Sequence, residues 1–157
     1  MGLALEQAEK ARALGEVPVG CVIVREGVVI GEGYNRRETD KTVLGHAELM
    51  AMKQAEQTIG DWRLSDCTLY VTLEPCPMCA GAIVNARIPR VVYGASDKKC
   101  GACGSVCDLF GMDFNHHPAV TAGVREEEAT AMLQEFFREL RVELKSRPKW
   151  RRPEVNK

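Results

Sequence analysis

The hydrophobic and polar positions along the chain switch between helical and extended spacing. Apolar residues recur at helical spacing in several segments, which predicts helices over 3–14, 46–59, 77 to about 87, and from 126 onward. Shorter runs rich in β-branched residues predict strands over 17–24, 28–30, 67–73, 91–93 and 119–124. Helices between strands indicate an α/β fold, with a sheet covered by helices on both faces.

The periodicity also predicts which side chains of the outer helices are buried. In the first helix the predicted apolar face is made of Leu3, Ala4, Ala8, Ala11 and Leu14. In the last helix the residues expected to face the core are Ala129, Leu133, Phe136 or Phe137, Leu140 and Leu144. Pro148 is expected to end or kink this helix.

Length and composition are those of a one-domain globular protein. The chain has 157 residues, of which 45% are hydrophobic and 27% charged. No apolar run approaches the roughly 18 residues of a membrane span, and no signal peptide is visible, so we expect no membrane association and a cytoplasmic location. The odd count of seven cysteines argues against a disulfide framework.

Charge is uneven along the chain. The formal net charge is −1, yet residues 141–157 hold seven basic and two acidic residues, a local charge of +5. Such a stripe can meet phosphates, whereas the alternative is a solvated C-terminus kept soluble by its charge.

Two short motifs indicate the chemistry. Pro75-Cys76-Pro77-Met78-Cys79 offers two thiols that can clamp one metal ion, and His46 can supply a third ligand. Three protein ligands leave one tetrahedral position for water, as in catalytic zinc sites. Glu48 follows His46 by two residues, so it should project near the metal without binding it and pass protons between water and substrate.

H-x-E followed by P-C-x-x-C is the signature of zinc-dependent nucleobase deaminases. Cys76 and Cys79 are expected at the start of a helix, where the positive end of the dipole favours thiolates. A buried core histidine beside two buried thiols is the alternative, but it explains neither Glu48 nor the spacing. The predicted zinc-dependent deaminase domain covers residues 1–146, and residues 147–157 form a basic C-terminal tail.

With these motifs, the sequence resembles the bacterial tRNA-specific adenosine deaminases of the cytidine deaminase-like superfamily over almost its whole length. The zinc motif is shared with deaminases of free bases and nucleosides, whereas Phe-Phe-Arg in the last helix is similar to the tRNA-acting branch. The segments that carry the resemblance are Gly15-Glu16-Val17-Pro18-Val19-Gly20, Asn35, His46-Ala47-Glu48, residues 69–79, Arg87-Ile88-Pro89, Val92-Tyr93-Gly94-Ala95 and Phe136-Phe137-Arg138.

This resemblance implies a three-layer α/β/α cytidine deaminase-like fold with a central mixed sheet. It implies a homodimeric enzyme that deaminates adenosine to inosine at the wobble, or first anticodon, position of a tRNA. It implies one Zn²⁺ per chain on His46, Cys76 and Cys79, with Glu48 as the catalytic proton shuttle. It also implies substrate contacts at Asn35, Ala47 and Pro75, and contacts to the anticodon loop at Asp97, Lys99, Phe137 and Arg138.

The sequence departs from the family pattern at three places. Leu44-Gly45 stands before the H-A-E motif where the family has Thr-Ala or a similar pair, and His117 replaces a common arginine. Cys100, Cys103 and Cys107 lie in a loop that is usually poorer in cysteine. They are interpreted as reduced thiols, with a second metal, completed by His116 or His117, as the alternative.

Two other functions stay open at this point. A free-base deaminase acting on guanine or cytosine would share the zinc motif, but it would not need a basic tail. A non-catalytic, zinc-stabilised RNA-binding domain would not need Glu48.

Overall fold

The computed structural model describes residues 1–146, so the predicted basic tail at 147–157 and Pro148 lie outside the described residues. The elements in chain order are α1 (Gly2–Ala13), β1 (Gly20–Arg25), β2 (Val28–Tyr34), α2 (Ala47–Ile59), β3 (Cys67–Leu73), α3 (Pro77–Asn85), β4 (Arg90–Ala95), β5 (Ala119–Thr121) and α4 (Glu126–Ser146). Every predicted helix and strand is present, with ends that move by a few residues. No helix within residues 1–146 combines the length and apolarity that crossing a membrane requires.

The strands form one mixed sheet in the order β2-β1-β3-β4-β5. β1 is antiparallel to β2 and β3, whereas β4 is parallel to β3 and β5. β1 and β2 make the predicted tight hairpin, in which Glu26 and Gly27 have positive φ angles of 50° and 79°. Two successive positive φ angles are typical of a type I′ turn, which matches the twist of the paired strands.

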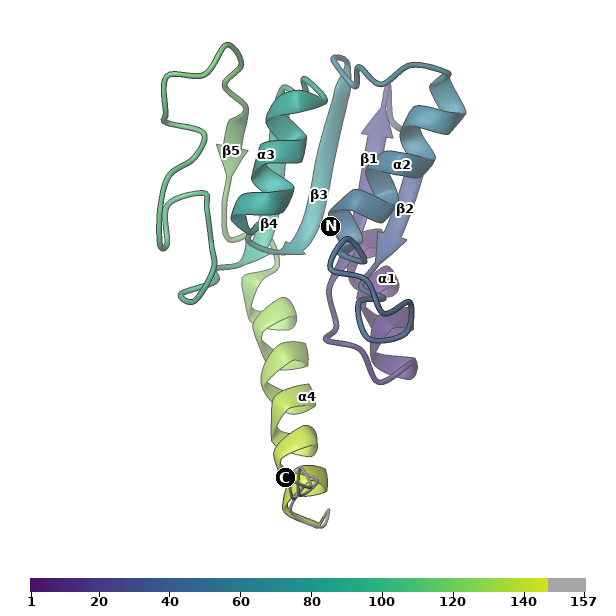
Figure 1. Cartoon of the computed structure of the whole chain (residues 1–157), viewed down its shortest axis with the longest axis vertical. Helices are drawn as coiled ribbons and strands as arrows, with labels where there is room; N and C mark the ends of the chain where they lie inside the picture. The colour runs from purple at the N-terminus through teal and green to yellow at the C-terminus, as the bar shows by residue number, and fades with distance from the viewer. Residues whose placement is uncertain (147–157) are drawn as a thin grey trace, which may run out of the picture.

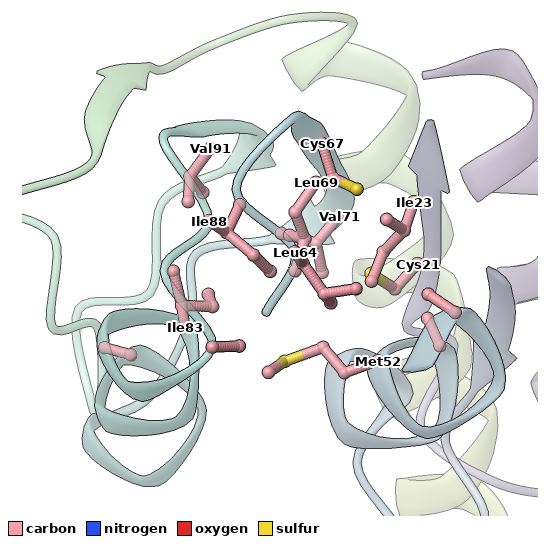
Figure 2. Close-up of a cluster of buried hydrophobic side chains, with 14 of the residues drawn as sticks. Cys21, Ile23, Met52, Leu64, Cys67, Leu69, Val71, Ile83, Ile88 and Val91 are labelled. Carbon is pink, nitrogen blue, oxygen red and sulfur yellow. The ribbon is translucent and has the colours of Figure 1, made fainter. Parts of the chain in front are cut away.

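Helices cover both faces of this sheet, as predicted (Figure 1). α2 and α3 lie on one face, and their apolar side chains pack with those of β1, β3 and β4 in the main core. Figure 2 shows Met52 of α2 and Ile83 of α3 directed toward Leu64 and Val71 in this cluster. On the other face, Leu5 of α1 and Ala129 of α4 pack with Ala95 of β4 in a smaller cluster. The three-layer α/β/α architecture is confirmed.

The predicted apolar faces of the outer helices are partly wrong. Leu3 and Leu14 are 45% and 50% exposed, while Leu5 and Gln7 are buried in their place. α1 therefore rests on the sheet by a face rotated from the predicted one. Small residues dominate the face that α1 buries, because the helix approaches the sheet closely.

In α4 the burial stops after the first half. Ala129 and Phe136 are its buried residues, whereas Leu144 is 53% exposed. The reason is visible in Figure 1, where α4 continues past the edge of the sheet at which β3 ends. Its second half has no sheet to cover, so helical periodicity there does not report burial.

A close contact between β2 and α2 fixes the start of α2. Gly33 of β2 faces the first turns of that helix, and a Cβ at this position would lie 2.2 Å from the carbonyl oxygen of Ala47 and 2.5 Å from the nitrogen of Ala51. Only glycine allows this approach. The contact sets the position of the helix end that carries the H-A-E motif.

Candidate active site

The histidine and cysteine motifs both lie at helix starts. His46 is the N-cap residue of α2, and Cys76 is the N-cap residue of α3, with Pro77 at the first helical position. Proline is tolerated there because its missing N–H would have no partner inside the helix. β3 ends just before Cys76, so the chain carries this motif out of the sheet and directly into α3.

The three side chains predicted to bind a metal come together in one cluster. The Nδ1 atom of His46 lies 3.6 Å from Sγ of Cys76 and 3.5 Å from Sγ of Cys79. Zinc bonds of about 2.3 Å to sulfur and 2.0–2.1 Å to nitrogen at tetrahedral angles would place sulfur and nitrogen about 3.6 Å apart. All three ligand atoms lie within 4.8 Å of one another. The donor set and its spacing therefore match a tetrahedral zinc site.

The protonation of the two thiols suits cation binding. Hydrogen bonds from Cys79 and His46 lower the pKa of Cys76 to about 4, so this side chain is a thiolate at neutral pH. The pKa of Cys79 is raised, because its thiol donates to Cys76 and is buried. One ligand is thus already ionised, and a bound cation would displace the proton from the second.

Glu48 lies in the first turn of α2 and is only 4% exposed. Burial raises the pKa of this carboxyl to about 7, and its side chain is within hydrogen-bonding reach of Cys79. A carboxyl with a pKa near neutrality can both accept and donate a proton at physiological pH. Its position beside the ligand cluster is the one expected for a proton shuttle.

Asn35 follows β2 and is held by three hydrogen bonds of its side chain. Its Nδ2 group donates to the Val17 carbonyl (3.2 Å) and to the buried Glu16 carboxylate (3.4 Å), and its Oδ1 accepts from the backbone N–H of Arg37 (3.3 Å). The backbone N–H of Arg36, the residue after Asn35, donates to the carbonyl of Gly45 at 2.8 Å. This bond closes the loop that separates Asn35 from His46. Asn35 therefore lies near the start of α2, where His46 is the N-cap residue.

The other predicted nucleoside contacts are buried. Ala47 is fully buried at the start of α2, and Pro75 is fully buried just before Cys76. Leu44, the departure before the H-A-E motif, is 58% exposed. A Cβ on Gly45 would meet Arg37 N at 2.9 Å, so glycine allows the loop to close here.

The predicted anticodon contacts lie on two separate elements. Asp97 and Lys99 belong to the loop after β4, where Oδ1 of Asp97 accepts the backbone N–H groups of Lys99 (2.9 Å) and Cys100 (3.3 Å). Phe137 and Arg138 lie on α4, and both are exposed. Phe136 is the core member of the aromatic pair and meets Phe137 edge to face, with ring centroids 5.4 Å apart.

Comparison with known proteins shows the family of this chain. The family model for MafB19-like deaminases matches residues 1–141. The chain belongs to this family. It is 48% identical over 144 residues to the tRNA-specific adenosine deaminase of Bacillus subtilis, covering 91% of this chain and 89% of the relative. The resemblance expected from the motifs is confirmed.

Solved structures agree with the deaminase fold. A tRNA:A34 deaminase, from a study of A-to-I editing at the wobble position of transfer RNA, superposes with a TM-score of 0.82 at 44% identity, covering 85% of this chain and 97% of that one. A guanine deaminase from Bacillus subtilis superposes less well, with a TM-score of 0.58 at 30% identity, covering 94% and 93% of the two chains. The fold is thus shared by deaminases of different substrates.

The loop cysteines do not form a second metal cluster. Within residues 1–146, His46, Cys76 and Cys79 are the only group of three or more side chains close enough to share an ion. Cys100 and Cys107 are exposed free thiols.

Sequence reasoning missed the role of two buried carboxylates, Glu16 and Glu74, each 2% exposed. Glu16 holds Asn35 and accepts the backbone N–H of Thr39 at 2.5 Å. Glu74 accepts hydrogen bonds from the loop after β4. An acidic residue inside an otherwise apolar segment was the available signal, because such a group is buried only when donors satisfy its charge.

Proposed function

We propose that this deaminase is a zinc-dependent tRNA adenosine deaminase, which hydrolyses adenosine to inosine at the wobble position of the anticodon. The observation that carries the proposal is the placement of His46 Nδ1 at 3.5–3.6 Å from both cysteine sulfurs, next to the buried Glu48. The named relatives support adenosine in tRNA as the substrate.

His46, Cys76 and Cys79 would hold the metal. Zinc, when bound, supplies Lewis acidity that lowers the pKa of a water from about 15.7 to about 7. Glu48 takes the proton as the water oxygen attacks C6 of adenine. It then delivers protons to the ring nitrogen and to the departing amine, so that adenosine and water become inosine and ammonia.

The surroundings of Glu48 explain why it can perform both transfers. Burial favours its neutral form and so keeps the carboxyl near its midpoint at physiological pH. Its place in the first turn of α2 fixes it relative to His46, the N-cap residue of the same helix. The proton carrier and one ligand therefore move as one unit.

Substrate binding would involve an unstacked nucleotide. The target base must leave its stack to reach the site, which costs a few kcal/mol and is cheapest in a looped single strand. Hydrogen bonds to Glu16 and Val17 hold Asn35 near the start of α2, where it would orient the nucleoside. The exposed Phe137 and Arg138 on α4 and Lys99 on the loop after β4 would contact the anticodon loop.

A free-base deaminase is the second candidate, because the guanine deaminase of Bacillus subtilis shares the fold. A non-catalytic RNA-binding domain is disfavoured by Glu48, since a purely structural metal site has no use for a buried carboxyl with a pKa near 7.

A deamination assay on zinc-loaded protein tests the proposal, with inosine measured in the RNA and ammonia release measured for every substrate. The substrates are an anticodon stem-loop with adenosine at the wobble position, the same stem-loop with adenosine moved one position along the loop, and free adenosine, guanine and cytosine. Inosine in the first RNA alone is the expected result, and the Glu48→Ala protein should make none. Turnover of guanine or cytosine without inosine in RNA would instead establish the second candidate.

The homodimer that the family resemblance implies, and the cytoplasmic location expected from the composition, are part of the same proposal. Sedimentation velocity of the zinc-loaded protein should give the mass of two chains. A species that stays at one chain across micromolar concentrations would contradict the dimer.

A further inference from the structure

Glu74 is a buried carboxylate that receives its hydrogen bonds from one loop. Its Oε1 accepts the backbone N–H groups of Cys103 (2.9 Å) and Ser105 (3.1 Å), and its Oε2 accepts the N–H of Asp97 (2.9 Å) and the hydroxyl of Ser105. Within the described part of the chain no ion pair includes Glu74, so these donors alone compensate its charge. Hydrogen bonds to a charged acceptor are the stronger kind.

The loop over residues 97–107 wraps closely around this carboxylate. The backbone N–H of Gly101 donates to the Asp97 carbonyl, and the N–H of Ala102 donates to the Pro75 carbonyl, both at 2.8 Å. A Cβ on Gly101 would lie 2.4 Å from the carboxyl carbon of Glu74. Only a residue without a side chain allows the loop to pass this near.

The hydrogen bonds continue from Glu74 to the surface. Glu74 fixes the backbone of Asp97, and the Asp97 carboxylate in turn accepts the backbone N–H groups of Lys99 and Cys100. In the other direction, Glu74 directly precedes Pro75 and Cys76 at the end of β3. One side chain therefore joins the loop that bears Asp97 and Lys99 to the segment that bears a zinc ligand.

We propose that Glu74 is a positioning residue. It holds the 97–107 loop in a fixed position relative to the zinc site, so that an anticodon loop bound there presents its adenosine to the metal. This inference rests on the proposed function. Glu74 does not touch the substrate; it acts through Asp97 and Lys99. Its loss should weaken RNA binding and leave the chemical step nearly intact.

Glu74→Gln is the most selective variant, because an amide side chain cannot accept all four hydrogen bonds that the Glu74 carboxylate accepts. An amide oxygen at the Oε1 position keeps the Cys103 and Ser105 N–H groups, which places the amide nitrogen against the N–H of Asp97. The Ser105 hydroxyl can rotate to accept from that nitrogen, but the Asp97 N–H cannot. The variant should thus release Asp97 selectively.

The experiment measures inosine formation in the anticodon stem-loop, zinc content, and hydrogen exchange of the backbone amides. Glu74→Gln should raise KM for the stem-loop about tenfold, leave kcat within about twofold and keep zinc bound. Exchange should speed up at the amides of residues 97–100, which depend on Asp97, and stay unchanged in α2 and α3. Ser105→Ala is the matched control, since it removes one hydroxyl and leaves each backbone N–H paired; its KM should stay near that of the unmodified protein.

Gly101→Ala tests the same idea without touching Glu74, because its methyl group pushes the loop off the carboxylate. It should reproduce the rise in KM, and it carries the test if Glu74→Gln does not fold. An unchanged KM in both variants, a fall in kcat alone, or loss of zinc would overturn the positioning role. If the unmodified protein makes no inosine in any stem-loop, the proposed function fails, and the exchange data still decide whether Glu74 holds the loop.

Discussion

Gly33→Ala is expected to weaken zinc binding although Gly33 lies in β2 and touches no ligand. The added methyl group would stand 2.2 Å from the carbonyl oxygen of Ala47, where ordinary contact begins at 3.4 Å. α2 must then withdraw by about 1 Å, because close-packed elements have no spare volume. Ala47 directly follows His46, so the helix start and the imidazole move together.

The size of the effect follows from the tolerance of the metal site. Zinc bonds accept errors of about 0.2 Å, so a shift of about 1 Å cannot be absorbed without strain. We expect zinc affinity to fall by about 10–100-fold, as for other changes that disturb ligand orientation. Overpacking should also cost about 1–3 kcal/mol of stability. Turnover in the inosine assay should fall about 100-fold, because Glu48 moves with the same helix.

Gly81→Ala is the matched control. It makes the same chemical change in α3, where a Cβ would meet nothing within 4 Å. Its zinc affinity should be unchanged and its Tm equal or higher, since alanine is favoured over glycine within helices by about 1 kcal/mol. Zinc affinity is measured by competition with a chelating dye, and stability by thermal unfolding. A Gly33→Ala protein that binds zinc like the unmodified protein would refute the idea that this contact sets the ligand geometry.

Three further predictions concern other parts of the chain. Glu48→Gln should lower kcat by at least about 100-fold with one zinc still bound, since it removes only the proton carrier; near-normal kcat would exclude that role. Cys79→Ser should lose zinc and lower the Tm, whereas Cys100→Ser should keep the metal, because Cys79 belongs to the ligand cluster and Cys100 does not. Elemental analysis of zinc in the two variants distinguishes these outcomes. Glu26→Asn should stabilise the hairpin by about 0.5 kcal/mol in urea unfolding, because asparagine tolerates the positive φ that precedes Gly27; an equal or lower midpoint would contradict this.

Much of the architecture was predictable from local patterns. The four helices and five strands appear near their expected places, since each depends on spacing within one short segment. The motifs around His46 and Cys76 were likewise predictable, because metal chemistry demands particular side chains at particular separations. The structure adds that both residues are N-caps, so two helix starts build one site.

Local patterns failed where burial depends on a distant partner. Helical spacing places Leu3 and Leu144 on apolar faces, yet both are exposed. Leu3 is exposed because the sheet meets another face of α1, and Leu144 because the sheet ends before it reaches this part of α4. The same reasoning could not choose between Phe136 and Phe137. Only the tertiary structure shows that Phe136 is the buried ring, at 8% exposed against 39% for Phe137.

The sequence by itself predicted the elements, the deaminase family and the three side chains, His46, Cys76 and Cys79, that the structure brings together as candidate metal ligands. Only the tertiary structure revealed that Glu74 gathers donors from a loop 23 to 31 residues away, and that Gly33 sets the position of α2. The physical reason is that periodicity and motif spacing report interactions between near neighbours in the chain. A buried carboxylate or a close backbone contact is decided by whichever distant segment the fold brings against it.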